Sequence, residues 1–167
     1  NLTQHKNIIE IPNLFDFNSV PNNLVYQPKE DYLIYLGRID KKKGIELIIN
    51  VLSKIKNKDI KLKILGTENE YSTYLKSKVN GFGLNNRVDF LGAIYNDEKY
   101  NLIANSRALI TPSYSEAIGM VNLEGAGCKT PVITTHQTGL NNEWNNYGGR
   151  LINPNETELL DAINECL

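Results

Sequence analysis

The segment Asp31–Ile55, DYLIYLGRIDKKKGIELIINVLSKI, contains a strand pattern followed by a helix pattern. Tyr32–Leu36 is a short apolar run that ends at Gly37, which is typical of a buried strand. Apolar residues then recur at helical spacing, at positions 45, 48, 49, 52 and 55. Between the two patterns lies a loop with four cationic residues, Arg38 and Lys41–Lys43. The segment therefore predicts a strand, a cationic loop and a helix.

The same alternation continues to the end of the chain. The pattern predicts further strands and helices, with strands at 62–65, 88–91, 108–111, 131–134 and 150–152 and helices at 71–79, 97–104, 119–127 and 156–166. Strands that alternate with helices at this spacing indicate βαβ units, and right-handed crossovers place helices on both faces of the sheet. We therefore expect an α/β fold, a Rossmann-like, doubly wound and mostly parallel sheet of about six strands.

The domain organisation follows from where this alternation begins. Residues 31–167 are expected to form one Rossmann-like domain. Residues 1–30 contain Pro12, Pro21 and Pro28 among several asparagines, a composition that favours turns and extended pieces. We interpret this stretch as a linker or lead-in from an upstream domain.

Composition excludes several classes of protein. The chain has 167 residues, of which 41% are hydrophobic and 22% charged, and its net charge is -1. These values are typical of a globular domain and argue against disorder and against broad electrostatic binding of nucleic acid. The start of the chain does not resemble a signal peptide, and no apolar run approaches the roughly 18 residues of a membrane span. Two cysteines, Cys128 and Cys166, are too few for a disulfide scaffold, so we expect reduced thiols in a cytoplasmic protein.

The expected strand order locates the ligand site. In a six-stranded doubly wound sheet with the order 3-2-1-4-5-6, strands 1 and 4 are neighbours whose helices leave on opposite faces. A crevice then opens between the loops that follow these two strands, where ligands bind. The loop after Leu36 and the loop after Thr111 should therefore form the site.

Both loops contain groups that suit an anion. Arg38 offers a planar fork of donors for phosphate oxygens, and Lys43 offers a compact charge, although a lysine run before a helix is also common on a solvated surface. If a helix begins near Gly119, the N–H groups of Gly119, Met120 and Val121 are free to bind an anion.

Two glutamates flank this expected anion site. Eight helical residues would separate Glu116 from Glu124 by about 12 Å, which is too far for a carboxylate pair that shares a proton. They are suited to act as separate acceptors for hydroxyl groups such as those of a ribose or a sugar. The alternative is that both are ordinary acidic residues near a helix N-terminus.

The residues of these loops match a family pattern. Gly37-Arg38 with Lys43-Gly44, then Ser115–Glu124, SEAIGMVNLE, and then Thr130-Pro131-Val132-Ile133 resemble the C-terminal half of retaining glycosyltransferases of family 4. Those enzymes have the GT-B architecture, in which two Rossmann-like domains face each other across a cleft. The resemblance covers residues 31–167 and extends weakly to Ile11-Pro12-Asn13, which is similar to the segment that joins the two domains.

The resemblance implies roles for the matching residues. Arg38 and Lys43, beside Gly37, would bind the diphosphate of a nucleotide sugar donor and stabilise the leaving group, and Glu116 would contact the transferred sugar. Gly119, Met120 and Val121 would present N–H groups to the phosphate or sugar, Glu124 would hold the ribose, and the loop around Ile94 would hold the base.

The resemblance also implies which ligands and partners to expect. The donor would be UDP- or GDP-linked, and no cofactor or metal is expected, since His5 and His136 lie far apart and no metal-ligand spacing occurs. The acceptor, a glycan or a lipid-linked molecule, would bind an N-terminal domain outside the matched residues. The isolated domain is therefore expected to bind donor but to transfer little. The full-length enzyme is expected to act in bacterial polysaccharide biosynthesis, with peripheral membrane association as a further expectation.

Two stretches depart from the family pattern. Lys129 occupies a position where glycine is usual, which should alter that turn. Thr138-Gly139-Leu140 occurs where a double glycine is common, which affects the prediction of donor-sugar contacts there.

Other functions remain open at this point. A nucleotide-sugar epimerase of the same architecture would isomerise the donor without an acceptor, and a non-catalytic module would bind a nucleotide sugar without turnover. A dinucleotide dehydrogenase is disfavoured, because the loop after the first strand lacks the G-x-G-x-x-G pattern.

Overall fold

A computed structural model describes residues 15–24, 31–116, 119–146 and 148–167. Six parallel strands form one sheet in the order β3-β2-β1-β4-β5-β6, which confirms the expected doubly wound topology. The strands are β1 (Tyr32–Leu36), β2 (Lys61–Leu65), β3 (Val88–Gly92), β4 (Ala108–Thr111), β5 (Val132–Thr135) and β6 (Gly149–Ile152). The α-helices are α1 (Ile45–Lys54), α2 (Glu70–Gly81), α3 (Asn96–Asn105), α4 (Met120–Gly127) and α5 (Glu156–Cys166).

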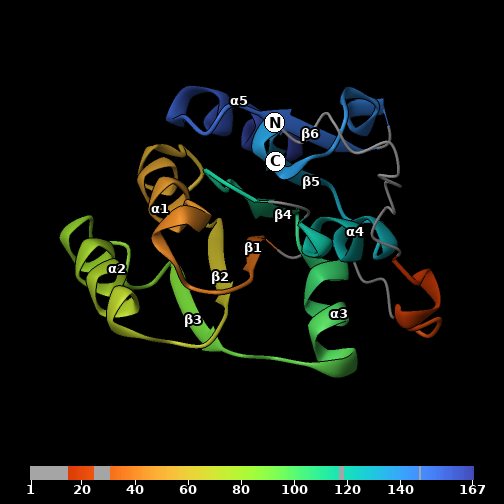
Figure 1. Cartoon of the computed structure of the whole chain (residues 1–167). Helices are drawn as coiled ribbons and strands as arrows, with labels where there is room; N and C mark the ends of the chain where they lie inside the picture. The colour runs from red at the N-terminus through yellow and green to blue at the C-terminus, as the bar shows by residue number, and fades with distance from the viewer. Residues whose placement is uncertain (1–14, 25–30, 117–118, 147) are drawn as a thin grey trace, which may run out of the picture.

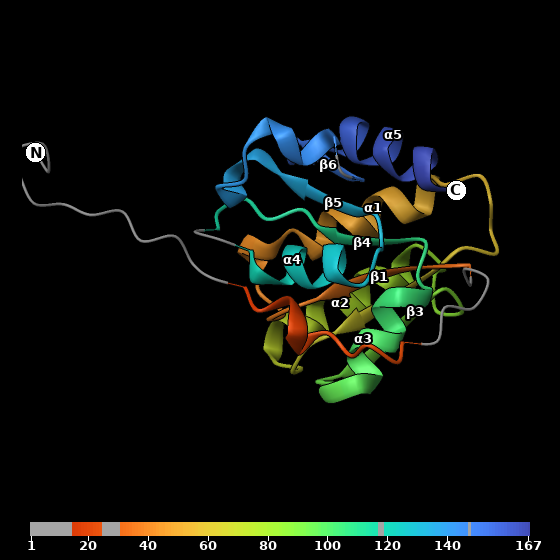
Figure 2. The same ribbon diagram turned by 90° about the vertical axis from the view of Figure 1, so that its right-hand side faces the viewer.

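Helices cover both faces of the sheet (Figures 1 and 2). One face is covered by α1, α2 and α5, and the other by α3 and α4. Alternate residues of β1 point to the two sides: Leu33 and Tyr35 belong to the first buried cluster, whereas Tyr32 and Ile34 belong to the second. Because β1 is buried on both faces, its sequence is a continuous apolar run and does not alternate between apolar and polar residues.

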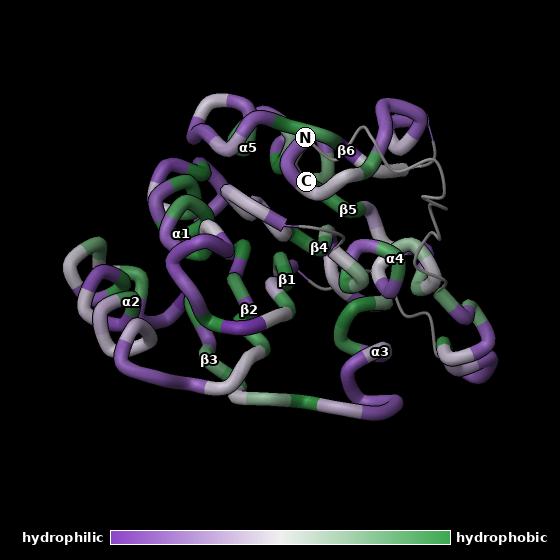
Figure 3. Tube along the Cα trace, in the orientation of Figure 1, coloured by the Kyte–Doolittle hydropathy of each residue, from purple (hydrophilic) through white to green (hydrophobic). Residues whose placement is uncertain are grey.

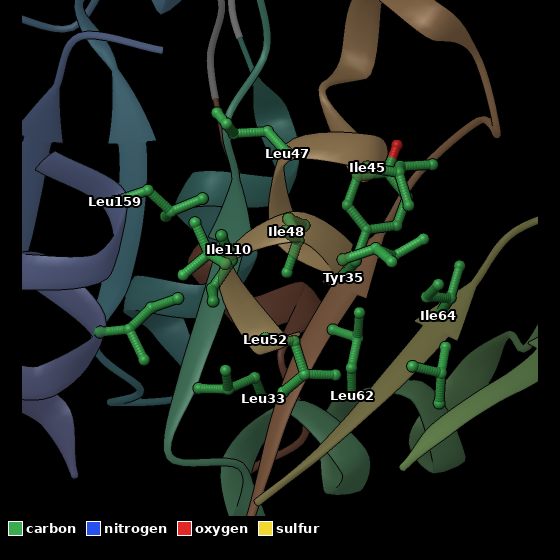
Figure 4. Packing of buried hydrophobic residues seen from close by; sticks show 14 of the residues in the cluster. Leu33, Tyr35, Ile45, Leu47, Ile48, Leu52, Leu62, Ile64, Ile110 and Leu159 are labelled. Carbon is green, nitrogen blue, oxygen red and sulfur yellow. The ribbon is translucent and has the colours of Figure 1, made fainter. Parts of the chain in front are cut away.

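Apolar packing of α1 fixes the first face. Ile45, Ile48 and Leu52 recur on one side of the helix, and all three are buried against β1, β2 and β4. Figure 4 shows the Leu52 side chain beside those of Leu33 and Leu62, and the Ile45 side chain near Tyr35. The hydropathy of the chain follows the same layers, because apolar residues line the strands and the loop between β1 and α1 is hydrophilic (Figure 3).

Local caps account for the small differences between the expected and observed bounds. The helix expected at 71–79 extends over Glu70–Gly81, since Asn69 and Ser72 form a reciprocal capping box at its start. The helix expected from Gly119 begins at Met120, with Gly119 as its N-cap. The other expected strands and helices agree with the structure to within about two residues, which is the usual uncertainty of element ends.

The segment before β1 packs on the domain over part of its length. Residues 17–19 form a short 3-10 turn capped by Asp16, and Val20 is buried in the cluster that contains α3 and α4. The predicted joining segment Ile11-Pro12-Asn13 lies outside the described residues. The lead-in over residues 1–30 therefore stays a prediction, although residues 15–20 lie against α4 near Gly127.

The turn around Lys129 has a geometry that the sequence pattern did not reveal. Lys129 adopts a left-handed backbone conformation with φ 55°, the region that glycine occupies most easily. The backbone bonds Lys129 N–H to Ala126 O, 2.9 Å, and Thr130 N–H to Gly125 O, 3.0 Å, close the helix end. Lysine therefore takes a glycine-like conformation at this turn.

Both cysteines are free thiols, and Cys128 is buried.

The close approach of α4 to the sheet gives a prediction about stability. An added Cβ at Gly125 would lie 2.7 Å from both Leu109 Cδ2 and Val132 Cγ2. We expect Gly125→Ala to lower the free energy of unfolding in urea by about 1–3 kcal/mol, because the buried neighbours must shift. Gly81→Ala is the control, since nothing lies within 4 Å of its added Cβ and alanine favours helix. Equal unfolding curves for the two variants would contradict the tight packing of α4.

Candidate functional site

The loop after β1 is held in shape by its own backbone and by the neighbouring strand. Gly37 has a φ of 147°, and its N–H donates to Leu65 O at 3.0 Å. The Tyr35 hydroxyl donates to the Arg38 carbonyl at 2.6 Å. Asp40 caps the 3-10 turn Lys41–Lys43 by accepting from Lys42 N–H at 2.8 Å. The Arg38 backbone is therefore fixed at the carboxyl end of β1.

The loop after β4 lies directly against this first loop. Tyr114 N–H donates to Lys42 O at 2.8 Å. Gly44 has a left-handed φ of 71°, and its Cα faces the carbonyl of Pro112 so closely that a Cβ would overlap it. The two loops expected to form the site are therefore joined through their main chains.

A pocket of about 220 Å³ opens between the two loops. Seven of the predicted site residues line it: Gly37, Arg38, Lys43, Glu116, Gly119, Met120 and Val121. The Arg38 side chain and the tip of α4 thus share one hollow, as the strand order requires. Ala117 and Ile118 of the quoted pattern lie outside the described residues.

The two predicted cations differ in their contacts. The Lys43 ammonium forms an ion pair with the Glu116 carboxylate, and both side chains are mostly buried. The Arg38 guanidinium has neither a hydrogen bond nor an ion pair with any residue that the structure describes, and Arg38 is exposed. Arg38 is therefore available to an anion, while Lys43 already balances one carboxylate. An ammonium has three donors, so Lys43 can hold Glu116 and a further oxygen together.

The tip of α4 is anchored by a buried polar network beneath the pocket. Thr111 Oγ1 lies 2.5 Å from Asn122 Oδ1 and 3.0 Å from Thr134 Oγ1, and Asn122 Nδ2 donates to Thr134 Oγ1 at 3.2 Å. All three side chains are buried. The first-turn N–H groups of Gly119, Met120 and Val121 make no hydrogen bond to a described residue, as expected at a helix start. The network holds these amides at the pocket.

A second pocket of about 470 Å³ continues from the first. Both are lined by Leu36, Gly37 and Arg38, and the second extends to Ile94 and Tyr95 after β3. The Gly66 N–H bond to Gly92 O, 2.8 Å, joins the loops that follow β2 and β3 along this side. The predicted base-binding loop thus lies in a hollow continuous with the predicted phosphate pocket.

Glu124 lies next to these pockets rather than in their lining. It is one helical turn beyond Met120 and Val121, and its Oε2 lies 3.0 Å from Lys99 Nζ of α3. Oε2 is buried and accepts no hydrogen bond of good geometry from the described residues. Because α4 begins only at Met120, the stretch from Glu116 to Glu124 is not helical throughout, and the separation expected for eight helical residues does not apply.

Several pocket residues were not singled out from the sequence. Tyr35, Thr111, Ser113 and Asn122 also line the first pocket. Thr138, which the sequence analysis connected with donor-sugar contacts, lines it as well. Burial raises the pKa of Tyr35 above its ordinary value, and the nearby Glu116 and Asp40 carboxylates raise that pKa further. The Tyr35 hydroxyl therefore remains a proton donor to the Arg38 carbonyl at neutral pH. Its place two residues before Gly37, near the strand end, was the available signal.

The described residues, those outside 1–14, 25–30, 117–118 and 147, hold neither a candidate metal site nor a candidate membrane span. They contain no cluster of three or more His, Cys, Asp or Glu side chains that could hold a metal ion. Their helices are too short or too polar to span a membrane.

The chain matches known proteins over almost all of this domain. The family model described as "Glycosyl transferases group 1" matches residues 16–167. A curated relative, the phosphatidylinositol N-acetylglucosaminyltransferase gpi3 subunit of Schizosaccharomyces pombe, is 27% identical over 159 residues, covering 89% of this chain and 35% of the relative. This chain therefore spans about a third of that relative's length.

Solved structures of glycosyltransferases share the fold of this chain. The C-terminal domain of a glycosyl transferase group 1 family protein, LpcC from Francisella tularensis, superposes with a TM-score of 0.76 at 21% identity, covering 90% of this chain and 86% of that one. Anabaena HepE, solved in complex with UDP and glucose, superposes with a TM-score of 0.73 at 25% identity, covering 83% of this chain and 39% of HepE.

The six-stranded parallel sheet and its helices have the Rossmann-like fold of GT-B glycosyltransferase domains. The chain belongs to the glycosyl transferases group 1 family.

The contact between the two loops gives a second stability prediction. Gly44→Ala should lower the free energy of unfolding by more than the roughly 1–2 kcal/mol that a left-handed conformation costs an alanine, since its methyl also overlaps the Pro112 carbonyl. Gly83→Ala is the matched control, because Gly83 has a φ of 67° and open space around its Cβ position. If both variants unfold at the same urea concentration, the two loops are not in close contact.

Proposed function

We propose that this chain is the donor-binding domain of a retaining, metal-independent glycosyltransferase of family 4. Its donor is a nucleoside diphosphate sugar, UDP- or GDP-linked, and its acceptor is a glycan or lipid-linked molecule bound largely by another domain. The observation that supports this best is the convergence of Arg38, Lys43 and the α4 amides on one pocket. These groups, cations and N–H donors, complement a diphosphate.

Each part of the donor has a matching place in the two pockets. The diphosphate lies between Arg38 and the α4 tip, and the base lies in the second pocket near Ile94. The ribose between them faces α4, where Glu124 accepts from its hydroxyls. The transferred sugar lies toward Glu116 and Thr138. The complex of HepE with UDP and glucose supports a uridine nucleotide as the first ligand to test.

The proposed catalysis is electrostatic. When the bond between sugar and diphosphate breaks, negative charge grows on the departing phosphate, and fixed donors at that point stabilise the transition state more than the bound donor. Arg38 supplies charge that no described carboxylate neutralises, and Lys43 shares its charge between Glu116 and the leaving group. Tyr35 and the capped turn Lys41–Lys43 keep both cations in place.

Nucleotide binding is the direct test. We expect calorimetry with UDP, GDP and ADP to show at least one binder. Glu124→Ala should weaken that binding by about 1.5–3 kcal/mol, because a charged hydrogen bond to the ribose is lost. Glu165, on the distant helix α5, forms an exposed ion pair with Arg150. Glu165→Ala removes that carboxylate and should leave nucleotide binding unchanged. Absence of binding to all three nucleotides would contradict the proposal.

Turnover separates catalysis from binding. In the full-length enzyme, Arg38→Ala should lower kcat by about tenfold or more while nucleotide affinity falls less, since its interaction strengthens in the transition state. Lys41→Ala, which removes an exposed cation from the same loop, should change kcat little. Isomerised donor without any acceptor would instead favour an epimerase, and binding without turnover a non-catalytic module. An Arg38→Ala enzyme with unchanged kcat would exclude leaving-group stabilisation by Arg38.

A further inference from the structure

Lys99 lies beside the proposed ribose position, yet neither the loop patterns nor the family resemblance assigns it a role. It is on α3, one turn after Tyr95, a residue that lines the second pocket. Its partner Glu124 is on α4, one turn after Met120 and Val121, which line the first pocket. Helices α3 and α4 lie side by side on the same face of the sheet (Figures 1 and 2). The pair therefore joins the two helices about one turn beyond residues that line the two pockets.

The contact between Lys99 and Glu124 involves only one of the two carboxylate oxygens. Lys99 Nζ lies 3.0 Å from Glu124 Oε2, and the two side chains are 17% and 18% exposed. Oε2 itself has no exposed surface, so the exposed part of the Glu124 side chain consists of its other atoms. Oε1 has no partner among the residues that the structure describes. One carboxylate oxygen is thus held by a cation on the inner side, and the other is left for a ligand.

A carboxylate that binds two neighbouring hydroxyls needs a fixed orientation and a negative charge. An ammonium at 3.0 Å attracts one of the two oxygens and so restricts rotation about the last side-chain bond. Because both side chains are mostly buried, salt screens this ion pair less than it screens a pair on the surface. Without Lys99, Glu124 would keep its position on α4 but lose the contact that sets its orientation.

We propose that Lys99 is a positioning residue that orients the Glu124 carboxylate toward the 2′- and 3′-hydroxyls of the donor ribose. This rests on the proposed function, because it assumes a nucleoside diphosphate in the pockets. Lys99 acts through Glu124 and touches no reacting atom. Its role is to make the domain prefer a ribonucleotide over one that lacks the two hydroxyls.

The test compares two ligands across a set of variants. The ligands are the nucleoside diphosphate that binds in the calorimetric panel and its 2′,3′-dideoxy counterpart. We expect the wild-type chain to prefer the ribonucleotide. Lys99→Met should reduce that preference by about tenfold, within the range of coupling between residues in contact, and leave affinity for the dideoxy ligand within about twofold. Lys99→Arg retains the charge and should keep most of the preference.

Two controls separate positioning from general stability. In a Glu124→Gln background, Lys99→Met should have no further effect on the preference, since the carboxylate it orients is gone. Lys54→Met removes a more exposed lysine–glutamate pair, that with Glu156, at the far end of α1 and should leave the preference unchanged. Thermal unfolding of each variant checks that it is folded, and if Lys99→Met is not, Lys99→Gln replaces it.

The outcomes are distinct. An unchanged ribose preference in Lys99→Met, or an equal loss of affinity for both ligands, would overturn the role of Lys99 while leaving the proposed function intact. A wild-type chain that binds none of the nucleoside diphosphates would overturn both proposals.

Discussion

The main-chain contact between the loops after β1 and β4 is the constraint on which the site depends. Two contacts bring together segments about 70 residues apart in sequence. Tyr114 N–H donates to Lys42 O, and Gly44 packs closely against the Pro112 carbonyl. These loops leave the sheet at its switch point, where neighbouring strands send their helices to opposite faces. A cationic loop and a helix start therefore face one another across a pocket instead of lying on separate surfaces.

The rest of the domain holds this contact in place. The apolar cluster under α1 fixes the start of that helix, directly after Gly44. The Thr111–Asn122–Thr134 network fixes the start of α4, and satisfied buried polar groups of this kind favour a single arrangement. Two further backbone hydrogen bonds, from Gly37 N–H to Leu65 O and from Gly66 N–H to Gly92 O, connect the carboxyl ends of β1, β2 and β3 on the side of the second pocket. The site is thus formed at strand ends and helix starts, and groups held by such elements are positioned more precisely than groups on loops alone.

Most of the fold and part of the site could be predicted from the sequence. Apolar runs such as Tyr32–Leu36 and helical repeats such as those of α1 are local signals, and the strand order is the one usual for a six-stranded doubly wound sheet. That order placed Arg38 and Gly119 in one pocket. The pairing of Lys43 with Glu116 and of Lys99 with Glu124 could not be predicted in this way, because each depends on side chains that meet only in the folded chain. The buried network around Asn122 was missed for the same reason.

A crystal structure of this chain with UDP, or with GDP if that binds instead, tests the central claim most directly. The account predicts that oxygens of the diphosphate accept hydrogen bonds from the Arg38 guanidinium and from the N–H of Gly119 or Met120 at about 2.7–3.2 Å. A diphosphate bound elsewhere, or one that contacts only one of the two loops, would contradict it.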